Sequence, residues 1–343
     1  MMSTRARRLA LGALLALGLL YFVLKDLQLQ TLWTALRSAS PFYLLAVLAV
    51  TVVTYAARAW RWGGLLSPLA RVPFLDLFSA TWVGFMSGLV IPRAGEIVRP
   101  YLVARRHPVD TSAAFASIII ERLVDLITVV ALFALYLYVL PMPAAQSQGP
   151  VLDLLRAGAL GAAGVAIGVL GVLILFHVKA ERALELSERA LRWLPARLAA
   201  PVAGALRSFS KGLAVLRAPA GHLLGIMAQS LLVWLAIGAT IYFNNRAFGL
   251  DLPFHSAFLI VGFLTVGVAV PTPGMVGGFH AAYLIALTQV YGISKETAAA
   301  AAITAHALTN LPVLILGLAF LGREGLTVRT MAKVADQEER RTP

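Results

Sequence analysis

The stretch "VIPRAGEIVRP", residues 90–100, interrupts a long apolar run with a proline, a glycine and three charged side chains. Proline ends a helix, and a glycine three residues later lets the chain turn into a new one. In a membrane protein, such a break is tolerated where other parts of the protein or a water-filled cavity surround it. Residues 73–106 are therefore predicted to form two short helices joined at 92–95.

The chain around this break has the composition of an integral membrane protein. Of its 343 residues, 59% are hydrophobic and only 13% are charged, and the mean hydropathy is +0.82. Soluble domains have about a quarter of their residues charged. The formal net charge of +13 comes from basic residues between apolar runs, which favours a topological role over nucleic-acid binding. Cysteine is absent, which excludes disulfides and thiolate metal sites, and no cofactor is expected.

The predicted fold is all-α and polytopic, with one transmembrane domain over residues 1–325 and a charged cytoplasmic tail, 326–343. Apolar runs of about 20 residues are long enough to span a bilayer. They predict about six spanning helices, near 9–24 (taken as uncleaved), 41–57, 112–140, 152–178, 221–243 and 296–321. Residues 179–219 are hydrophilic, and the leucines on one helical face indicate an amphipathic helix at the membrane interface.

Segments 73–106 and 253–291 are each split by a proline and a glycine, and each is predicted to be a re-entrant hairpin. With six further spans, this arrangement puts most of the 29 lysine and arginine residues on one side, together with both termini. By the positive-inside rule both termini are then cytoplasmic.

The two split segments resemble each other. The runs that begin at Val72 and Leu252 both open with Pro-Phe and reach a proline about 18 residues later. A glycine follows that proline by three residues, Gly95 in the first run and Gly274 in the second. Residues 72–140 and 252–321 are therefore predicted to be inverted repeats, a common construction of secondary transporters. Chance likeness in a biased composition is the alternative.

The first break carries charge that suits an anionic ligand. Arg93 and Arg99 have planar donors that match phosphate, and the helix that starts near Gly95 points its positive end at the break. Glu96 lies three residues before Arg99 and is predicted to pair with it on one helical face. The alternative is that the Arg–Glu pair only closes the turn.

The next helix contains "ERLVDL", which places Glu121 and Asp125 on one face, with Arg122 three residues before Asp125. Charges this deep in a membrane usually face a bundle interior or water. Glu121 is predicted to pair with Arg93 or Arg99. The Arg122–Asp125 pair either contributes to the site or only holds helices together.

The second break, "PTPGMVGGFH", carries neither an acid nor an arginine. Gly274 and Gly277 permit close backbone approach, and His280 and His306 are the titratable groups nearby. A histidine in a span is either a proton-coupling group or a hydrogen-bonded packing residue. Candidate substrate-binding residues here are Pro271, Pro273, Gly274, Gly277, His280, His306 and Asn310.

Four motifs in order, "PRAGEIVRPYL" (92–102), "ERLVD" (121–125), "PTPGMVGGFHAA" (271–282) and "AITAH" (302–306), resemble the flippase-like transmembrane family. This family includes the membrane halves of lysylphosphatidylglycerol synthases. The resemblance implies a multi-pass protein of the bacterial cytoplasmic membrane that handles phospholipids or polyprenyl-type lipids. Its pattern maps onto Arg93, Gly95, Glu96, Arg99, Glu121, Arg122, Asp125, Pro271, Gly274, Gly277 and His280. The chain ends without a soluble aminoacyl-transferase domain, so lipid lysylation is not expected of it.

Three functions fit these features. The first is a flippase or scramblase that moves a lipid with an anionic head group through a cavity between the hairpins, with no catalytic residue. The second is a membrane enzyme that modifies a lipid, although no metal-ligand motif or paired-carboxylate loop is present. The third is a lipid-binding scaffold for a synthase partner or a homo-oligomer. Membrane lipids are the expected partners in all three.

Overall fold

A computed structural model describes residues 4–25, 27–91, 94–141, 150–179, 189, 218–269 and 272–325 (the backbone alone at 4–13, 150–152, 154 and 176–177). Every regular element in these ranges is a helix, which confirms the all-α prediction. Arg93, Pro271, nearly all of the predicted amphipathic segment and the tail lie outside them.

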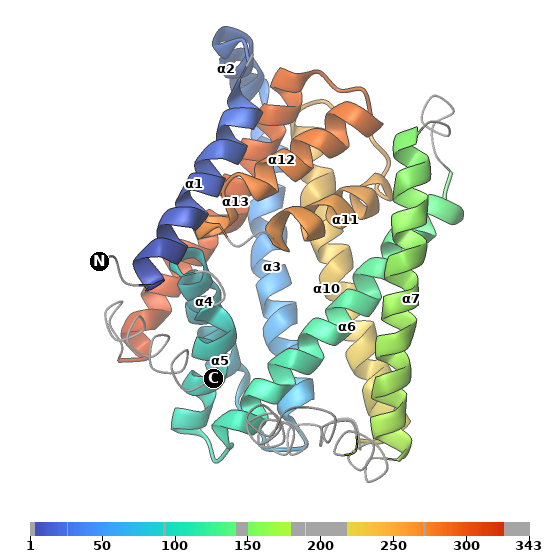
Figure 1. Ribbon diagram of the computed structural model, residues 1–343. Helices are drawn as coiled ribbons and strands as arrows, with labels where there is room; N and C mark the ends of the chain where they lie inside the picture. The colour runs from blue at the N-terminus through green and yellow to red at the C-terminus, as the bar shows by residue number, and fades with distance from the viewer. Residues whose placement is uncertain are drawn as a thin grey trace.

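In the part of the chain that the structure describes, seven helices of known bounds lie outside the two split segments (Figure 1). They are α1 (Thr4–Leu24), α2 (Leu29–Ser38), α3 (Pro41–Leu66), α6 (Thr111–Tyr138), α7 (Pro150–Val178), α10 (Ala220–Ala247) and α13 (Lys295–Arg323). Four are long and apolar enough to cross a membrane by themselves: α3, most of α7, α10 and α13. The bent pair α1–α2 brings the number to as many as five. The count of six spans and the sidedness stay predictions.

Each split segment forms a helical hairpin. The first pairs α4 (Phe74–Val90) with α5 (Ala94–Arg106), and the second pairs α11 (Ser256–Ala269) with α12 (Gly278–Ile285). The second turn contains a short 3-10 helix, η3 (Pro273–Met275), and α12 continues into a π-helical turn, η4 (Ala286–Val290). Figure 1 shows the first hairpin in the lower half of the molecule and the second in the upper half.

A pair of glycines lets the two arms of each hairpin approach closely. A Cβ added to Gly95 would fall within 3.0 Å of the backbone of Gly84, and the same is true of Gly278 against Gly267. Each pair is separated by eleven residues, so the two hairpins share one register. The structural counterpart of Gly95 is therefore Gly278, and the pairing with Gly274 predicted from the sequence is wrong. That pairing followed the prolines, whereas backbone contact between the two arms decides the register.

Contacts between the two halves are reciprocal. The helix after the first hairpin, α6, packs on α11 of the second, and the helix after the second hairpin, α13, packs on α4 of the first. Helices α3 and α10 lie antiparallel along one another, with the Ser40 N–H donating to the Ala247 carbonyl at 2.8 Å. This reciprocal packing is what inverted repeats would give, and the repeats themselves stay a prediction.

Two hydrophobic clusters form the core, one around each hairpin. Trp62 and Trp82 lie in the cluster around α4 and α5, and Tyr283 and Tyr136 lie in the cluster around α11 and α12. The hairpin tips meet between the clusters, where η3 packs against the end of α4 near Leu89.

An ionic cluster, the base clasp, joins the base of the first hairpin to the end of α13. The Ser79 hydroxyl donates to the buried carboxylate of Glu324 at 2.5 Å, and Arg106 approaches the same carboxylate at 3.2 Å. Asp76 approaches Arg323 at 2.9 Å and His107 at 3.1 Å. The clasp fixes the open end of the hairpin to the other half of the molecule.

Candidate functional site

The site begins with two carboxylates on α6. Glu121 and Asp125 are one helical turn apart, so both project from the same face of the helix. Glu121 is fully buried and Asp125 is 5% exposed. Carboxylates this deep need charged partners, because an unpaired buried charge costs several kcal/mol. Arginines from three helices supply them.

Arg99 on α5 forms a two-point contact with Glu121. Its Nη1 and Nη2 donate to the two carboxylate oxygens at 3.0 and 3.1 Å. The guanidinium also lies over the ring of Trp62, 4.5 Å from its centroid, and Gly84 leaves room for the aliphatic part of the side chain. Arg99 therefore pairs with Glu121, one of the two predicted alternatives, and the predicted pairing with Glu96 is wrong. Glu96 lies one turn too early on α5 to meet the guanidinium once it turns toward α6.

Arg61 on α3 is fully buried and contacts both acids. Its guanidinium pairs with Asp125 and approaches Glu121 Oε1 at 3.3 Å, while Nη1 also donates to Ser230 Oγ on α10 at 2.9 Å. The sequence placed the end of this span near Ala57, but α3 continues to Leu66. The helix continues because Arg61 finds acidic partners inside the bundle and does not need the membrane surface.

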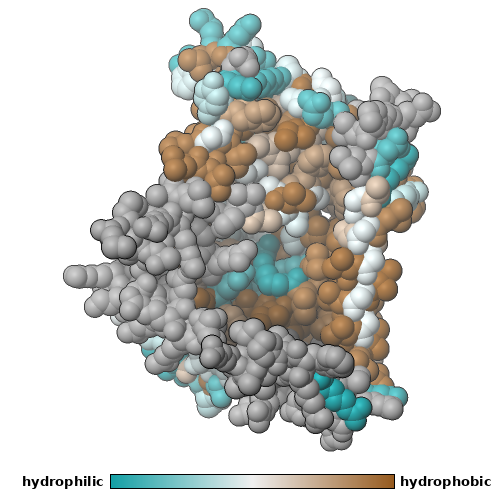
Figure 2. Space-filling view, in the orientation of Figure 1, coloured by the Kyte–Doolittle hydropathy of each residue, from teal (hydrophilic) through white to brown (hydrophobic). Residues whose placement is uncertain are grey.

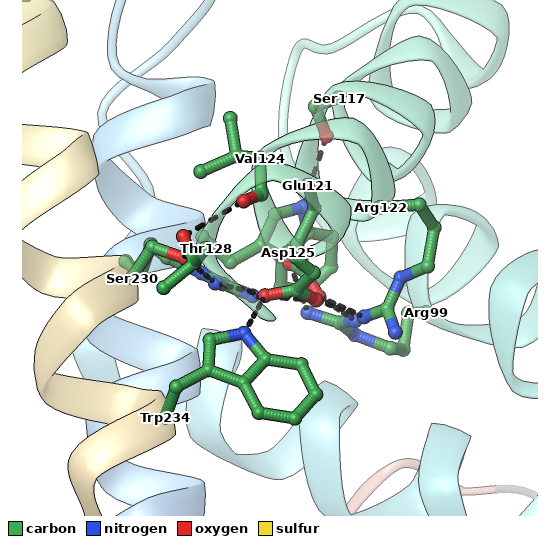
Figure 3. Close-up of polar contacts among 11 residues, drawn as sticks. Arg99, Ser117, Glu121, Arg122, Val124, Asp125, Thr128, Ser230 and Trp234 are labelled. Carbon is green, nitrogen blue, oxygen red and sulfur yellow. Dashed lines mark hydrogen bonds and ion pairs between the residues drawn. The ribbon is translucent and has the colours of Figure 1, made fainter. Parts of the chain in front are cut away.

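Arg122 and Trp234 complete the cluster shown in Figure 3. Arg122 contacts Glu121 and lies 3.4 Å from Asp125, which agrees with the predicted spacing of three residues. Trp234 Nε1 on α10 donates to Asp125 Oδ1 at 2.8 Å. The network therefore joins α3, α5, α6 and α10.

Arg58, one turn before Arg61, adds a fourth guanidinium. It lies over the ring of Phe85, 5.2 Å from the centroid, and within electrostatic range of Asp125, Arg61 and Arg122. Four guanidinium groups thus face the two carboxylates of α6, and the group carries an excess of positive charge.

One member of the cluster, Arg122, reaches the surface. Figure 2 shows a recess in the middle of this face, with a hydrophilic floor, at a height between the two hairpins of Figure 1. The side chain of Arg122 is 40% exposed, whereas those of Arg61, Arg99 and Glu121 are at most 3% exposed. Arg122 is therefore much more exposed than these three members of the cluster.

A second polar group lies at the tip of the other hairpin. His306 Nε2 lies 2.7 Å from the carbonyl oxygen of Gly274, and the His280 and His306 rings are 4.6 Å apart. Gly274 and Gly277 adopt left-handed backbone angles, with φ of 60° and 86°. Asn310 donates to the His306 carbonyl at 2.8 Å, and Pro273 starts η3. These residues shape the turn, and within the described ranges no three His, Cys, Asp or Glu side chains are grouped to hold a metal ion.

Sequence reasoning brought together Arg99, Glu121, Arg122 and Asp125, and it missed the helices that complete the site. The predicted span ended at residue 57, before Arg58 and Arg61, and neither these arginines nor Ser230 and Trp234 were singled out. The available signal was their spacing, because Arg58 and Arg61 are three residues apart on a helix that "AARAW" continues without a break.

Two known proteins are similar in sequence to most of this chain. The family model of the lysylphosphatidylglycerol synthase TM region matches residues 9–317. Glycosyltransferase AglD of Haloferax volcanii is 27% identical over 361 aligned residues, which cover 94% of this chain but only 57% of that protein. A UPF0104 membrane protein of Methanothermobacter thermautotrophicus is 23% identical over 316 residues, covering 86% of this chain and 89% of that protein. The match to the family model extends over the helices that build the arginine cluster, and the chain belongs to the lysylphosphatidylglycerol synthase TM-region family.

Proposed function

We propose that this membrane protein transports a phospholipid or polyprenyl-type lipid with an anionic head group across the bacterial cytoplasmic membrane. The observation that carries the proposal is the excess of arginine over acid in a cluster whose member Arg122 is exposed. The hydrophilic recess at a height between the two hairpins supports it (Figure 2). A lipid head group needs a polar path through the bilayer, while its tails stay among apolar helices. Arg122 is the exposed contact of that path.

The reciprocal packing of the two halves supports movement of one half against the other. Opposed repeats with a site at their interface are a common basis of alternating access in transporters. Here the arginine cluster takes Ser230 and Trp234 from α10 and its other members from α3, α5 and α6. The site therefore spans both halves, as alternating access requires.

Lipid movement in liposomes tests the proposal. Purified protein is reconstituted with fluorescent phosphatidylglycerol, and dithionite reduction from outside measures how fast the label crosses. Arg122→Gln should lower the protein-dependent rate at least tenfold, because it removes the exposed cation but leaves Glu121 paired with Arg99 and Arg61. Arg71→Gln changes an exposed arginine and should keep the native rate. The absence of any protein-dependent rate in the native chain would refute transport, and equal rates in both variants would refute Arg122 as the exposed contact of the path.

A membrane-embedded transferase is the second candidate, because one relative is named a glycosyltransferase. Against it, both carboxylates of the cluster are tied to arginines, so neither is free to accept a proton from a substrate. Formation of a modified lipid by the purified chain from a labelled donor would favour this reading. A scaffold role predicts instead that a synthase copurifies with the chain and that no lipid moves.

A further inference from the structure

Hydrogen-bond donors outnumber acceptors around the arginine cluster. Arg58 Nη1 is buried and has no hydrogen-bond partner among the described residues, and the same is true of the Nε atoms of Arg61, Arg99 and Arg122. Buried donors without partners are rare in native proteins, and each calls for an explanation such as an unseen ligand. The carboxylates cannot supply it, because Glu121 and Asp125 already accept from other guanidinium groups or from Trp234.

Arg58 differs from the other three arginines because no side chain in the described ranges forms an ion pair with it. Its guanidinium is stacked on Phe85, and Tyr55 lies edge-on to the same ring at 5.0 Å. Trp82 stacks on Tyr55 at 4.3 Å, and its buried Nε1 also lacks a partner. The aromatic rings orient the arginine without neutralising it. Arg58 is thus a positioned donor with free capacity, and Trp82 adds a second unpartnered donor to the same aromatic group.

The net charge of the cluster limits the class of ligand that fits it. Four guanidinium groups lie around the two buried carboxylates of α6, and Glu96 on α5 is an exposed acid. Positive charge stays in excess by at least one even when Glu96 is counted. A ligand with a single negative charge and several acceptor oxygens balances both the charge and the donors, and a phosphodiester has these properties.

We propose that Arg58 binds the phosphodiester oxygens of a lipid head group that enters the recess past Arg122. This inference rests on the proposed function and names its substrate class. Arginine suits the role because its planar donors fit two phosphate oxygens at once, whereas lysine offers a point charge. Arg61 and Arg99 stay in their ion pairs with the acids of α6 and set the positive field.

Direct lipid binding tests the assignment. Purified protein is titrated with phosphatidylglycerol as the phosphodiester probe, with phosphatidic acid, with uncharged diacylglycerol and with inorganic phosphate, and native mass spectrometry measures occupancy. The native chain should bind phosphatidylglycerol at least tenfold more tightly than diacylglycerol and more tightly than phosphatidic acid. Arg58→Gln should remove this preference, while Arg71→Gln should keep it.

Several results would overturn the assignment. They are equal binding of phosphatidylglycerol and diacylglycerol by the native chain, unchanged preference in Arg58→Gln, and occupancy by inorganic phosphate alone. If Arg58→Gln does not fold, Arg58→Lys keeps the charge and should lose at least threefold in affinity, so native affinity in that variant also counts against the site. Binding without any movement of lipid in liposomes would instead refute transport and leave this site standing.

Discussion

Neutralising Glu121 should destabilise the protein more than any other single change in the arginine cluster. In Glu121→Gln the side chain keeps its shape but loses the charge that serves Arg99 at 3.0 and 3.1 Å, Arg61 at 3.3 Å, and Arg122. Removing one partner of a buried ion pair costs about 3–5 kcal/mol, and three guanidinium groups depend on this carboxylate. We expect a loss in the upper half of that range. The remaining amide oxygen still accepts one hydrogen bond, which limits the loss.

Arg99→Gln should cost less, about 1–3 kcal/mol, because Glu121 keeps two other arginines. Because the two side chains are in contact, the loss of stability in the double variant should be smaller than the sum of the two single losses, by about 1–3 kcal/mol. Unfolding by sodium dodecyl sulfate in mixed micelles, followed by tryptophan fluorescence, measures each free energy. Asp153→Asn is the matched control, since this exposed acid on α7 should change stability by less than about 0.5 kcal/mol. A loss below about 1 kcal/mol in Glu121→Gln, or a larger loss in Arg99→Gln, would refute the assigned network.

Three further changes test other parts of the fold by the same unfolding assay. Gly95→Ala should cost about 1–3 kcal/mol because the new Cβ meets backbone of the facing helix, whereas Gly171→Ala, with nothing within 4 Å, should be neutral or stabilising; equal effects would contradict the hairpin register. In the base clasp, Glu324→Gln should cost more than about 1.5 kcal/mol because its carboxylate is buried, and Asp76→Asn, with a side chain 20% exposed, should cost less than about 1 kcal/mol. The reverse order would show that the clasp is held by the exposed pairs. His306→Phe should cost about 1 kcal/mol because it removes the hydrogen bond to the turn of the second hairpin. If this variant is as stable as the native chain, the hydrogen bond does not contribute to stability.

Much of the fold could be predicted because a membrane-spanning helix needs a long apolar run, which is easy to recognise in the sequence. Apolar runs long enough to span a bilayer stand out from their surroundings, and a proline within such a run demands a break. Both predicted breaks are present, between α4 and α5 and between α11 and α12. The acids of α6 could also be assigned to the interior, because charge in the middle of a span rarely faces lipid.

The missed residues depend on contacts between distant segments. Arg61 follows an apolar run and precedes a tryptophan, which is also the pattern of residues at a membrane surface. Its burial is explained by Asp125, which lies 64 positions later. The register of the hairpins was missed for a similar reason. Nothing in the local sequence marks Gly84 and Gly267, because their role depends on backbone contact with the opposite arm of the hairpin.

The two hairpins share the register of their glycine contact but differ in the side chains around it. Arg99 packs against Gly84 in the first hairpin, and Ala282 occupies the matching position against Gly267 in the second. The charge of the proposed ligand would therefore be met by the first half, and Asp125, which accepts from Trp234, joins this charge to α10 in the other half. Ser230 of α10 adds contacts with Arg61 and Thr128. In the proposed mechanism an anion held at Arg58 and Arg122 competes with the acids of α6 for Arg122. Weaker pairing of Arg122 with Asp125 would change the contact between α6 and α10, so we expect occupancy of the site to alter how the two halves fit.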